Sequence, residues 1–578
     1  MLTATSCADL DLNPPAAASR ESWFSTTDEV RLSLNDFYRT TFYVLEQAWM
    51  MDRNTDDWSQ RTNVYTIPAG TLNATSTGNP NVATIWSYSY KNITRANRIL
   101  ESLDQLKGQY PESELDPLRA EARFFRAYAY ARLITLWGDV PFYLTSITPE
   151  EAFEMGRTDK AQVLEQIYAD YDYAAENLPV DNNSGSVTRV DRGAAYAFKA
   201  HIALYQHDYA TCATAAKNCM DLGKYSLYED YGELFRDKTK NREVIFSIVH
   251  SNDLEINSSG TPTTQAINSW TARSCGGNAT AQPSWELLAC YEMTNGKTID
   301  EEGSGFDPHD PFANRDPRCL ETFCGPGTTI YGIEWNPAPN VLQVMDYDQN
   351  KMVTNKDSKG GSDATNAAYN ACLLRKGAQT EWRTLKRNEN PILLMRYADV
   401  PLMYAEAKIE LNDIDALTLA CINDVRARAY KTKRTDTANY PAITTTDQKA
   451  LRKVLRRERR VEFAWENLRY FDLLRWHLFE NAFSHNMFGF SRTAKLMKKY
   501  FEDGNWFWPE APTFDEEGFP CFEHMVDGTY IVQHGERYYD SKIVIRVSEG
   551  GNQYQIMTLT DSDGLMTVKN VSGPYQCR

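Results

Sequence analysis

The segment Asp191–Tyr225 constrains the fold most strongly, because it reads as two helices joined by a short turn. Its sequence, DRGAAYAFKAHIALYQHDYATCATAAKNCMDLGKY, carries apolar residues at helical spacing on both sides of a turn near His207 and Asp208. Small residues stand where the two helices would pack. A helical pair of about 34 residues cannot bury its apolar face alone, so it stacks against further pairs. The sequence therefore predicts a mainly α-helical chain built as a stacked array.

Other segments repeat this design at irregular intervals. Residues 84–106 and 118–143 read as long helices, and the second stops at Gly138 with Pro141 just beyond it. Residues 396–429 repeat the two-helix unit. Because the period is not maintained between the units, we expect an irregular, tetratricopeptide-like superhelix of helical pairs.

Two stretches depart from the helical pattern. Between Ser251 and Asn390, Gly, Asn, Pro, Ser and Thr dominate and helical periodicity nearly vanishes, which predicts a long loop-rich insertion. Residues 542–571 show three short β-type runs divided by the turn signals EGGN and DSDG, which predict a small C-terminal β-meander. The expected parts are an N-terminal tether (residues 1–20), an N-terminal helical part (21–250), the loop-rich, aromatic insertion (251–390), a C-terminal helical part (391–500) and an atypical tail (501–578).

The net charge, the motif content and the cysteine spacing argue against several classes of function. The formal net charge is -17, which argues against a broad nucleic-acid surface, because phosphate binding needs a positive field. The motifs GxSxG, HExxH and GxGxxG do not occur in the sequence. Of the 11 cysteines, the ten beyond Cys7 form no CxxC motif and no group with zinc-ligand spacing. We therefore expect no cofactor and no metal site.

The arginine-rich stretch LRRERRVEFAWENLRYFDLLRW, Leu455–Trp476, is interpreted as an internal seam of the helical scaffold. Its apolar residues recur at helical spacing, and Glu458 falls on the same stripe. An unpaired buried charge is costly, so Glu458 must find partners. Arginine suits this task, because its planar guanidinium stays charged and donates in pairs.

Further ion pairs are predicted within this helix. Arg459 can meet Glu462, and Glu466 can meet Arg469, because each partner lies three residues further on. Several tryptophans are expected to lie in the core, namely Trp86, Trp285, Trp465 and Trp476.

Several further motifs occur in one order along the chain: SCADLDLNPP at the N-terminus, AEARFFRAYAYARLITLWGDVPF, PSWELLACYEMTNG, NRDPR and RYADVPLMYAEA. Together with the stretch ending at Trp476, they resemble the SusD/RagB family of glycan-binding outer-membrane lipoproteins. The resemblance begins at about Cys7 and does not extend over the last ~70 residues, which form the predicted meander.

The resemblance implies a lipid on Cys7, which follows small residues as at the end of a bacterial lipoprotein signal peptide. It also implies four tetratricopeptide-like pairs, a place on the outer face of a Gram-negative outer membrane, and a SusC-like TonB-dependent transporter as partner. Such a protein captures an oligosaccharide or polysaccharide and delivers it to the transporter without cleaving it.

The sequence alone is also compatible with two other functions. A peptide-binding tetratricopeptide adaptor would use the concave face of the helical array. A glycoside hydrolase on a helical frame would need two carboxylates in a cleft.

Aromatic residues outside the helical pattern are the candidate glycan contacts, because Trp and Tyr can cover the apolar C–H faces of sugar rings. One of them follows NTDD in a polar stretch, and the others lie in the insertion. The candidates are Trp58, Trp270, Tyr331 and Trp335. Their rings are expected to be exposed.

Overall fold

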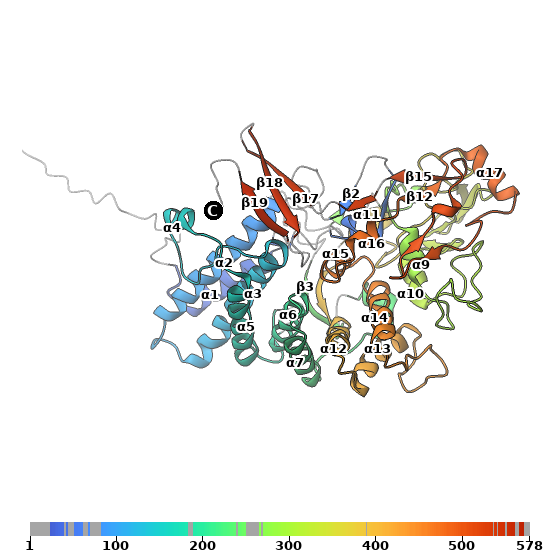
Figure 1. The fold of residues 1–578 in the computed structure, drawn as a ribbon. Helices are drawn as coiled ribbons and strands as arrows, with labels where there is room; N and C mark the ends of the chain where they lie inside the picture. The colour runs from blue at the N-terminus through green and yellow to red at the C-terminus, as the bar shows by residue number, and fades with distance from the viewer. Residues whose placement is uncertain are drawn as a thin grey trace, which may run out of the picture.

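The chain folds into a row of packed helices flanked by a region of short strands and loops (Figure 1). The computed structural model describes residues 23–39, 42–43, 51–61, 67–69, 82–182, 189–237, 241–249, 265–266, 270–385, 387–388, 390–535, 537–539, 542–549, 552–560 and 566–571. The long helices are α2 (Val82–Gln105), α3 (Glu112–Trp137), α5 (Lys160–Asn177), α6 (Arg192–Tyr205), α7 (Tyr209–Asp221), α12 (Asp399–Glu410), α13 (Ala416–Ala429) and α14 (Gln448–Glu462).

These helices pack in an order that follows the chain. Helix α2 packs on α3, and α3, α5, α6 and α7 follow one another. Helix α7 then packs on α12, which contacts α13 and α14, so the row continues past the insertion. The predicted mainly α, irregular helical array is confirmed. Shorter helices flank the row, namely α1 (Thr27–Leu34), α4 (Pro149–Glu154), α8 (Tyr231–Leu234), α9 (Trp285–Cys290), α10 (Pro317–Thr322), α11 (Trp382–Leu385), α15 (Arg469–Arg475), α16 (Phe479–Phe483) and α17 (Ala494–Glu502).

The helix boundaries follow local signals in the sequence. Asp191 and Asp208 are the N-caps of α6 and α7, and their side chains accept hydrogen bonds from the first-turn backbone. Between the two helices, His207 adopts a positive φ of 60°. Helix α3 ends at Trp137, where Gly138 takes a φ of 67°. The predicted turn and the predicted helix stop are thus confirmed.

The insertion contains more regular structure than its composition predicts. Four antiparallel strands follow one another as a meander, in the order β6-β7-β8-β9. They are too short to show a clear alternating pattern in the sequence. Their bounds are β6 (Thr328–Ile330), β7 (Ile333–Trp335), β8 (Gln343–Asp346) and β9 (Lys351–Thr354).

Small two-stranded sheets join segments that lie far apart in the chain. Strand β1 pairs with β5, β3 with β11, β4 with β10, β12 with β15, and β13 with β14, all antiparallel. Their bounds are β1 (Trp58–Gln60), β3 (Val244–Ile248), β4 (Gln265–Ala266), β5 (Ala281–Pro283), β10 (Arg387–Asn388), β11 (Ile392–Arg396), β12 (Met487–Phe490), β13 (Thr513–Phe514), β14 (Pro520–Cys521) and β15 (Ile531–Gly535).

Three hydrophobic cores lie inside the described chain. The first fills the helical row. The second combines Trp58 with apolar residues from 281–323, 461–465 and 488–531, and with Ala371, Cys372 and Leu374. The third lies within the insertion, beneath the β6–β9 sheet. The second core therefore joins stretches that the sequence analysis placed in separate parts, including the beginning of the tail.

The end of the described chain forms the predicted β-meander. Strands β17 (Lys542–Glu549), β18 (Asn552–Thr560) and β19 (Met566–Val571) form one antiparallel sheet in that order. Just before it, β16 (Arg537–Tyr539) runs parallel to β2 (Ile67–Ala69). Among the residues that the structure describes, none of the helices has the length and apolarity needed to cross a membrane.

Candidate functional site

The four aromatic residues predicted to bind glycan lie inside the protein. Their exposed fractions are 1% for Trp58, 2% for Trp270, 3% for Tyr331 and 2% for Trp335. The prediction that these rings are exposed is therefore wrong. A sugar cannot stack on them in this conformation.

Each of these rings packs into a core that only the tertiary fold creates. Trp58 stacks on Trp465 with ring centroids 4.7 Å apart, in the second core. Trp270 and Trp335 belong to the third core, where Tyr331 stacks on Trp382 at 6.2 Å. Of the tryptophans predicted to be core, Trp285 and Trp465 are buried, and Trp86 and Trp476 are partly buried against the first core.

The most exposed large apolar side chains that the structure describes in the insertion lie instead at the β8–β9 hairpin. Tyr347, in the turn, is 53% exposed, and Met352, in β9, is 55% exposed. Leu342 precedes β8 and is also exposed. Exposed polar side chains surround them: Gln343, Gln349, Asn350 and Thr354. We call these residues, together with Met345, the hairpin face.

The strand register places part of the hairpin face on one side of the sheet. Gln343 lies opposite Thr354, and Met345 lies opposite Met352. These two cross-strand pairs share a side, because side chains alternate along a strand. This side of the hairpin therefore carries the thioethers of Met345 and Met352 next to the amide of Gln343 and the hydroxyl of Thr354.

An arginine fork holds the turn that carries Tyr347. Arg383 donates from Nη1 to Asp346 Oδ1 at 2.9 Å and to Asp348 Oδ2 at 2.8 Å. It also donates from Nη2 to the second oxygen of Asp346. The hydrogen bonds from Arg383 lower the pKa of Asp346, which keeps the carboxylate charged. The carboxylates on both sides of Tyr347 are thus fixed, so the turn is ordered before a ligand arrives.

A pocket of about 310 Å³ opens on the helical part of the molecule. The hydroxyl of Tyr205 and the amide nitrogen of Gln206 have no hydrogen-bond partner among the described residues. The pocket is lined by Thr135, Lys160, Tyr205, Gln206, His207, Phe471, Leu474, Arg475 and His477. Its volume lies at the lower end of the roughly 300–1,000 Å³ typical of small-ligand pockets, so it is the second candidate site.

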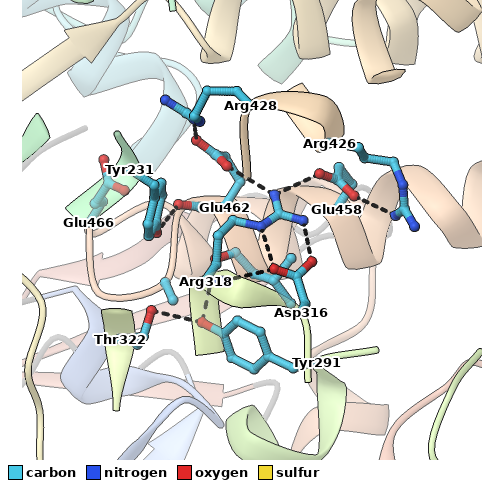
Figure 2. A network of polar contacts seen from close by, with 12 residues as sticks. Tyr231, Tyr291, Asp316, Arg318, Thr322, Arg426, Arg428, Glu458, Glu462 and Glu466 are labelled. Atoms are coloured by element: carbon cyan, nitrogen blue, oxygen red, sulfur yellow. Dashed lines mark hydrogen bonds and ion pairs between the residues drawn. The ribbon is translucent and has the colours of Figure 1, made fainter. Parts of the chain in front are cut away.

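Glu458 belongs to a buried charge network in which Arg318 lies between it, Asp316 and Glu462 (Figure 2). It is 1% exposed. Its two oxygens accept from Arg318 at 2.6 Å and from Arg426 at 2.8 Å. Because Arg318 belongs to α10, Arg426 to α13 and Glu458 to α14, the network ties the insertion to the helical row. The prediction that Glu458 is buried and paired with arginine is confirmed.

Glu462, one turn further along α14, extends the same network (Figure 2). It contacts Arg318 at 2.9 Å, Arg396 at 2.7 Å and Arg428. Burial alone would raise the pKa of Glu462, but Arg428, Arg396 and Arg318 together hold it well below its usual range. The carboxylate therefore stays charged inside the protein, as a structural group.

The two ion pairs predicted within one helix are replaced by longer-range contacts. Arg459 contacts Asp399 at 2.6 Å and Asp472 at 3.1 Å. Glu466 binds Arg396, and Arg469 binds Asp56, at 2.7 Å and 2.9 Å respectively. Helix α14 ends at Glu462 and α15 begins at Arg469, so Glu466 and Arg469 do not share a helix.

Comparisons with known proteins point to one family. A family model described as the SusD family matches residues 242–530. A second, described as "Starch-binding associating with outer membrane", matches residues 18–204. A SusD-like protein of Formosa agariphila, P25, is 26% identical over 408 residues, which cover 68% of this chain and 70% of the relative.

Solved structures share the fold. A SusD-like carbohydrate-binding protein of Bacteroides fragilis has a TM-score of 0.70 at 24% identity, covering 89% of this chain and 95% of its own. Surface glycan-binding protein A of Bacteroides fluxus has a TM-score of 0.55 at 20% identity, covering 79% and 90% of the two chains. The first family model alone spans half of the sequence, and the overall fold agrees with that of these structures, so the chain belongs to the SusD family.

Proposed function

We propose that this protein captures oligosaccharides at the hairpin face and delivers them to a SusC-like TonB-dependent transporter in the outer membrane. Membership of the SusD family supports this proposal, as do the two similar structures described as carbohydrate-binding and glycan-binding. We place the site here because the ring of Tyr347 is exposed and lies in a turn held by Arg383.

The hairpin face suits a neutral sugar chemically. A Tyr ring can cover the apolar face of a pyranose, and its hydroxyl can bond a sugar edge. The amides of Gln343, Gln349 and Asn350 can donate to and accept from sugar hydroxyls. Because the turn is held by Arg383, little ordering entropy is lost when a ligand binds.

Replacing Tyr347 by alanine is expected to weaken binding of the cognate oligosaccharide by about 1–3 kcal/mol, the range for losing a buried aromatic contact. The melting temperature should stay near wild type, because the ring is half exposed. Calorimetry of both variants against a glycan library measures the effect. Phe153→Ala, which removes an exposed ring on α4, is the matched control and should bind as wild type.

The same titrations locate the site if the hairpin face is not involved. Unchanged affinity in Tyr347→Ala together with weaker binding in His477→Ala would move the site to the pocket on the helical part. A parent protein that binds no glycan would favour the peptide-adaptor function. Release of shortened products from the glycan would favour a hydrolase.

We propose that a lipid on Cys7 anchors the protein to the outer membrane. Cys7 lies outside the described residues, and its sequence context supports its lipidation, while the description of the second family model supports association with the outer membrane. Expressed with a signal peptide, Cys7→Ala should leave the membrane fraction and carry no lipid by mass spectrometry. A Cys7→Ala protein that still carries lipid and partitions with membranes would place the anchor elsewhere.

A further inference from the structure

Cys521, His485 and Glu523 form a compact relay beside the second core, in which a sulfur, an imidazole nitrogen and a carboxylate oxygen lie within 4.8 Å of one another. The Sγ atom of Cys521 lies 3.1 Å from Nε2 of His485. The other ring nitrogen, Nδ1, lies 3.2 Å from Oε1 of Glu523. Both nitrogens of one imidazole are thus engaged, one by a thiol and one by a carboxylate. This is the arrangement of a nucleophile, a base and a group that orients the base.

Buried neighbours in the chain hold each member of the relay. Cys521 ends β14, and the next residue, Phe522, is buried in the second core. His485 lies between Phe483 and Met487, which are both buried. Glu523 also accepts a hydrogen bond from the backbone N–H of Phe522, at 3.1 Å. The three side chains therefore start from fixed backbone positions.

Cys521 also differs from the other described cysteines in access. It is partly exposed, whereas the other eight that the structure describes are buried: Cys212, Cys219, Cys275, Cys290, Cys319, Cys324, Cys372 and Cys421. A buried thiol without a base is inert, whereas an accessible thiol beside a base can react. None of the nine forms a disulfide within the described chain.

We propose that Cys521 is a base-assisted thiol that exchanges with small soluble disulfides. His485 Nε2 takes the proton from Sγ, and the sulfur attacks one sulfur of the disulfide. A bond forms between Cys521 and that sulfur, the disulfide bond breaks, and the other sulfur leaves as a thiolate with the bonding electron pair. The product is a mixed disulfide on the protein, and no external oxidant is needed.

The surroundings explain why a base is required. Burial and the carboxylates of Glu523 and Asp515 raise the pKa of Cys521 to about 11, so the thiol keeps its proton at neutral pH. The hydrogen bond that the His485 ring donates to the Glu523 carboxylate raises the pKa of His485, which stabilises the imidazolium that forms when the proton is transferred.

Reaction of the full-length chain with the aromatic disulfide DTNB, in a buffer containing a chelator, tests the proposal. Mass spectrometry of the peptide that contains Cys521 gives the rate at that residue alone. His485→Gln should lower this rate at least about tenfold, since general base catalysis typically contributes 10²–10⁴-fold. His524→Gln is the matched control, because His524 lies nearby and bonds to the Ala511 carbonyl rather than to the relay. Its rate should match wild type.

A second variant separates the base from a structural role of the histidine. In His485→Ala, added imidazole should restore the rate at Cys521, while it leaves the wild-type rate unchanged. A base role predicts this rescue, whereas a purely structural role does not. The proposal is overturned if Cys521 reacts as fast in His485→Gln as in wild type, or if imidazole fails to accelerate His485→Ala.

Discussion

Replacing Glu458 by alanine is expected to lower the free energy of unfolding by about 3–5 kcal/mol, the cost of breaking a fully buried ion pair. The carboxylate is 1% exposed and serves both Arg318 and Arg426. Both guanidiniums would lose a partner in a site that water does not reach. Arg318 would keep Asp316 and Glu462, and Arg426 would keep Glu292, so part of the network would survive.

Urea unfolding and thermal melting would measure the loss. Asp221→Ala is the control, because Asp221 forms an exposed i,i+4 pair with Lys217 and such pairs contribute only about 0.3–0.5 kcal/mol. Glycan affinity of the folded fraction should change little, since Glu458 is buried in the charge network and is not part of the hairpin face. A Glu458→Ala protein that melts like wild type would show that the buried ion pairs of Glu458 do not stabilise the fold.

Trp335→Ala is expected to destabilise the protein by about 3–5 kcal/mol, as large aromatic truncations in cores do. The ring fills the third core beneath the β6–β9 sheet and is 2% exposed. Its removal leaves a cavity that Trp270 and Tyr331 cannot fill without leaving their own packing. Trp335 supports the sheet from within and is not part of the hairpin face. The amount of glycan bound should therefore fall only in proportion to the folded fraction.

Tyr347→Ala is the natural comparison for this variant, since it should change affinity and leave the melting temperature unaltered. The two variants together distinguish a ring that supports the sheet from a ring that meets the ligand. Specific loss of affinity in Trp335→Ala, with a wild-type melting temperature, would mean that sugar reaches this ring and that Trp335 is a glycan contact, as its sequence context predicts.

The helical row was predictable because its signals are local. The turn at His207, the stop at Gly138 and the capping Asp208 each act within a few residues. The burial of Glu458 was also predictable, because a charge on an apolar helical stripe has nowhere else to go. Its partners were not, because Arg318 lies 140 positions away in the insertion.

The predictions that the structure contradicts also have physical causes. The spacing of the arginine-rich stretch predicts one helix, but the chain turns after Glu462, and Trp465 and Asn467 take positive φ values of 60° and 65°. Such a break is set by tertiary packing, here the stacking of Trp465 on Trp58. The composition around Trp270 and Trp335 is that of loops, and composition does not reveal a core that forms within the loops.

The sequence around Tyr347, the residue proposed to meet the ligand, carries a signal for its exposure. In MDYDQNKM, Tyr347 stands among Asp346, Asp348 and Asn350, which are turn formers. An aromatic residue in the middle of a turn has few neighbours to pack against, and this favours exposure. The same reasoning would have ranked it above Trp335, which lies at the end of a strand.

The contact between Asp57–Trp58 and Trp465 sets the order in which the protein can fold as it is made. Trp465 donates its Nε1–H to the Asp57 carbonyl across 408 positions of sequence. At about 5–20 residues per second, roughly 20–80 s pass between the synthesis of these two residues. Until then Trp58 has no ring to stack on, so the early chain carries uncovered apolar surface. Completion of the second core is therefore a late, slow step that depends on non-local closure, and a growing or translocating chain needs protection from aggregation in the interval.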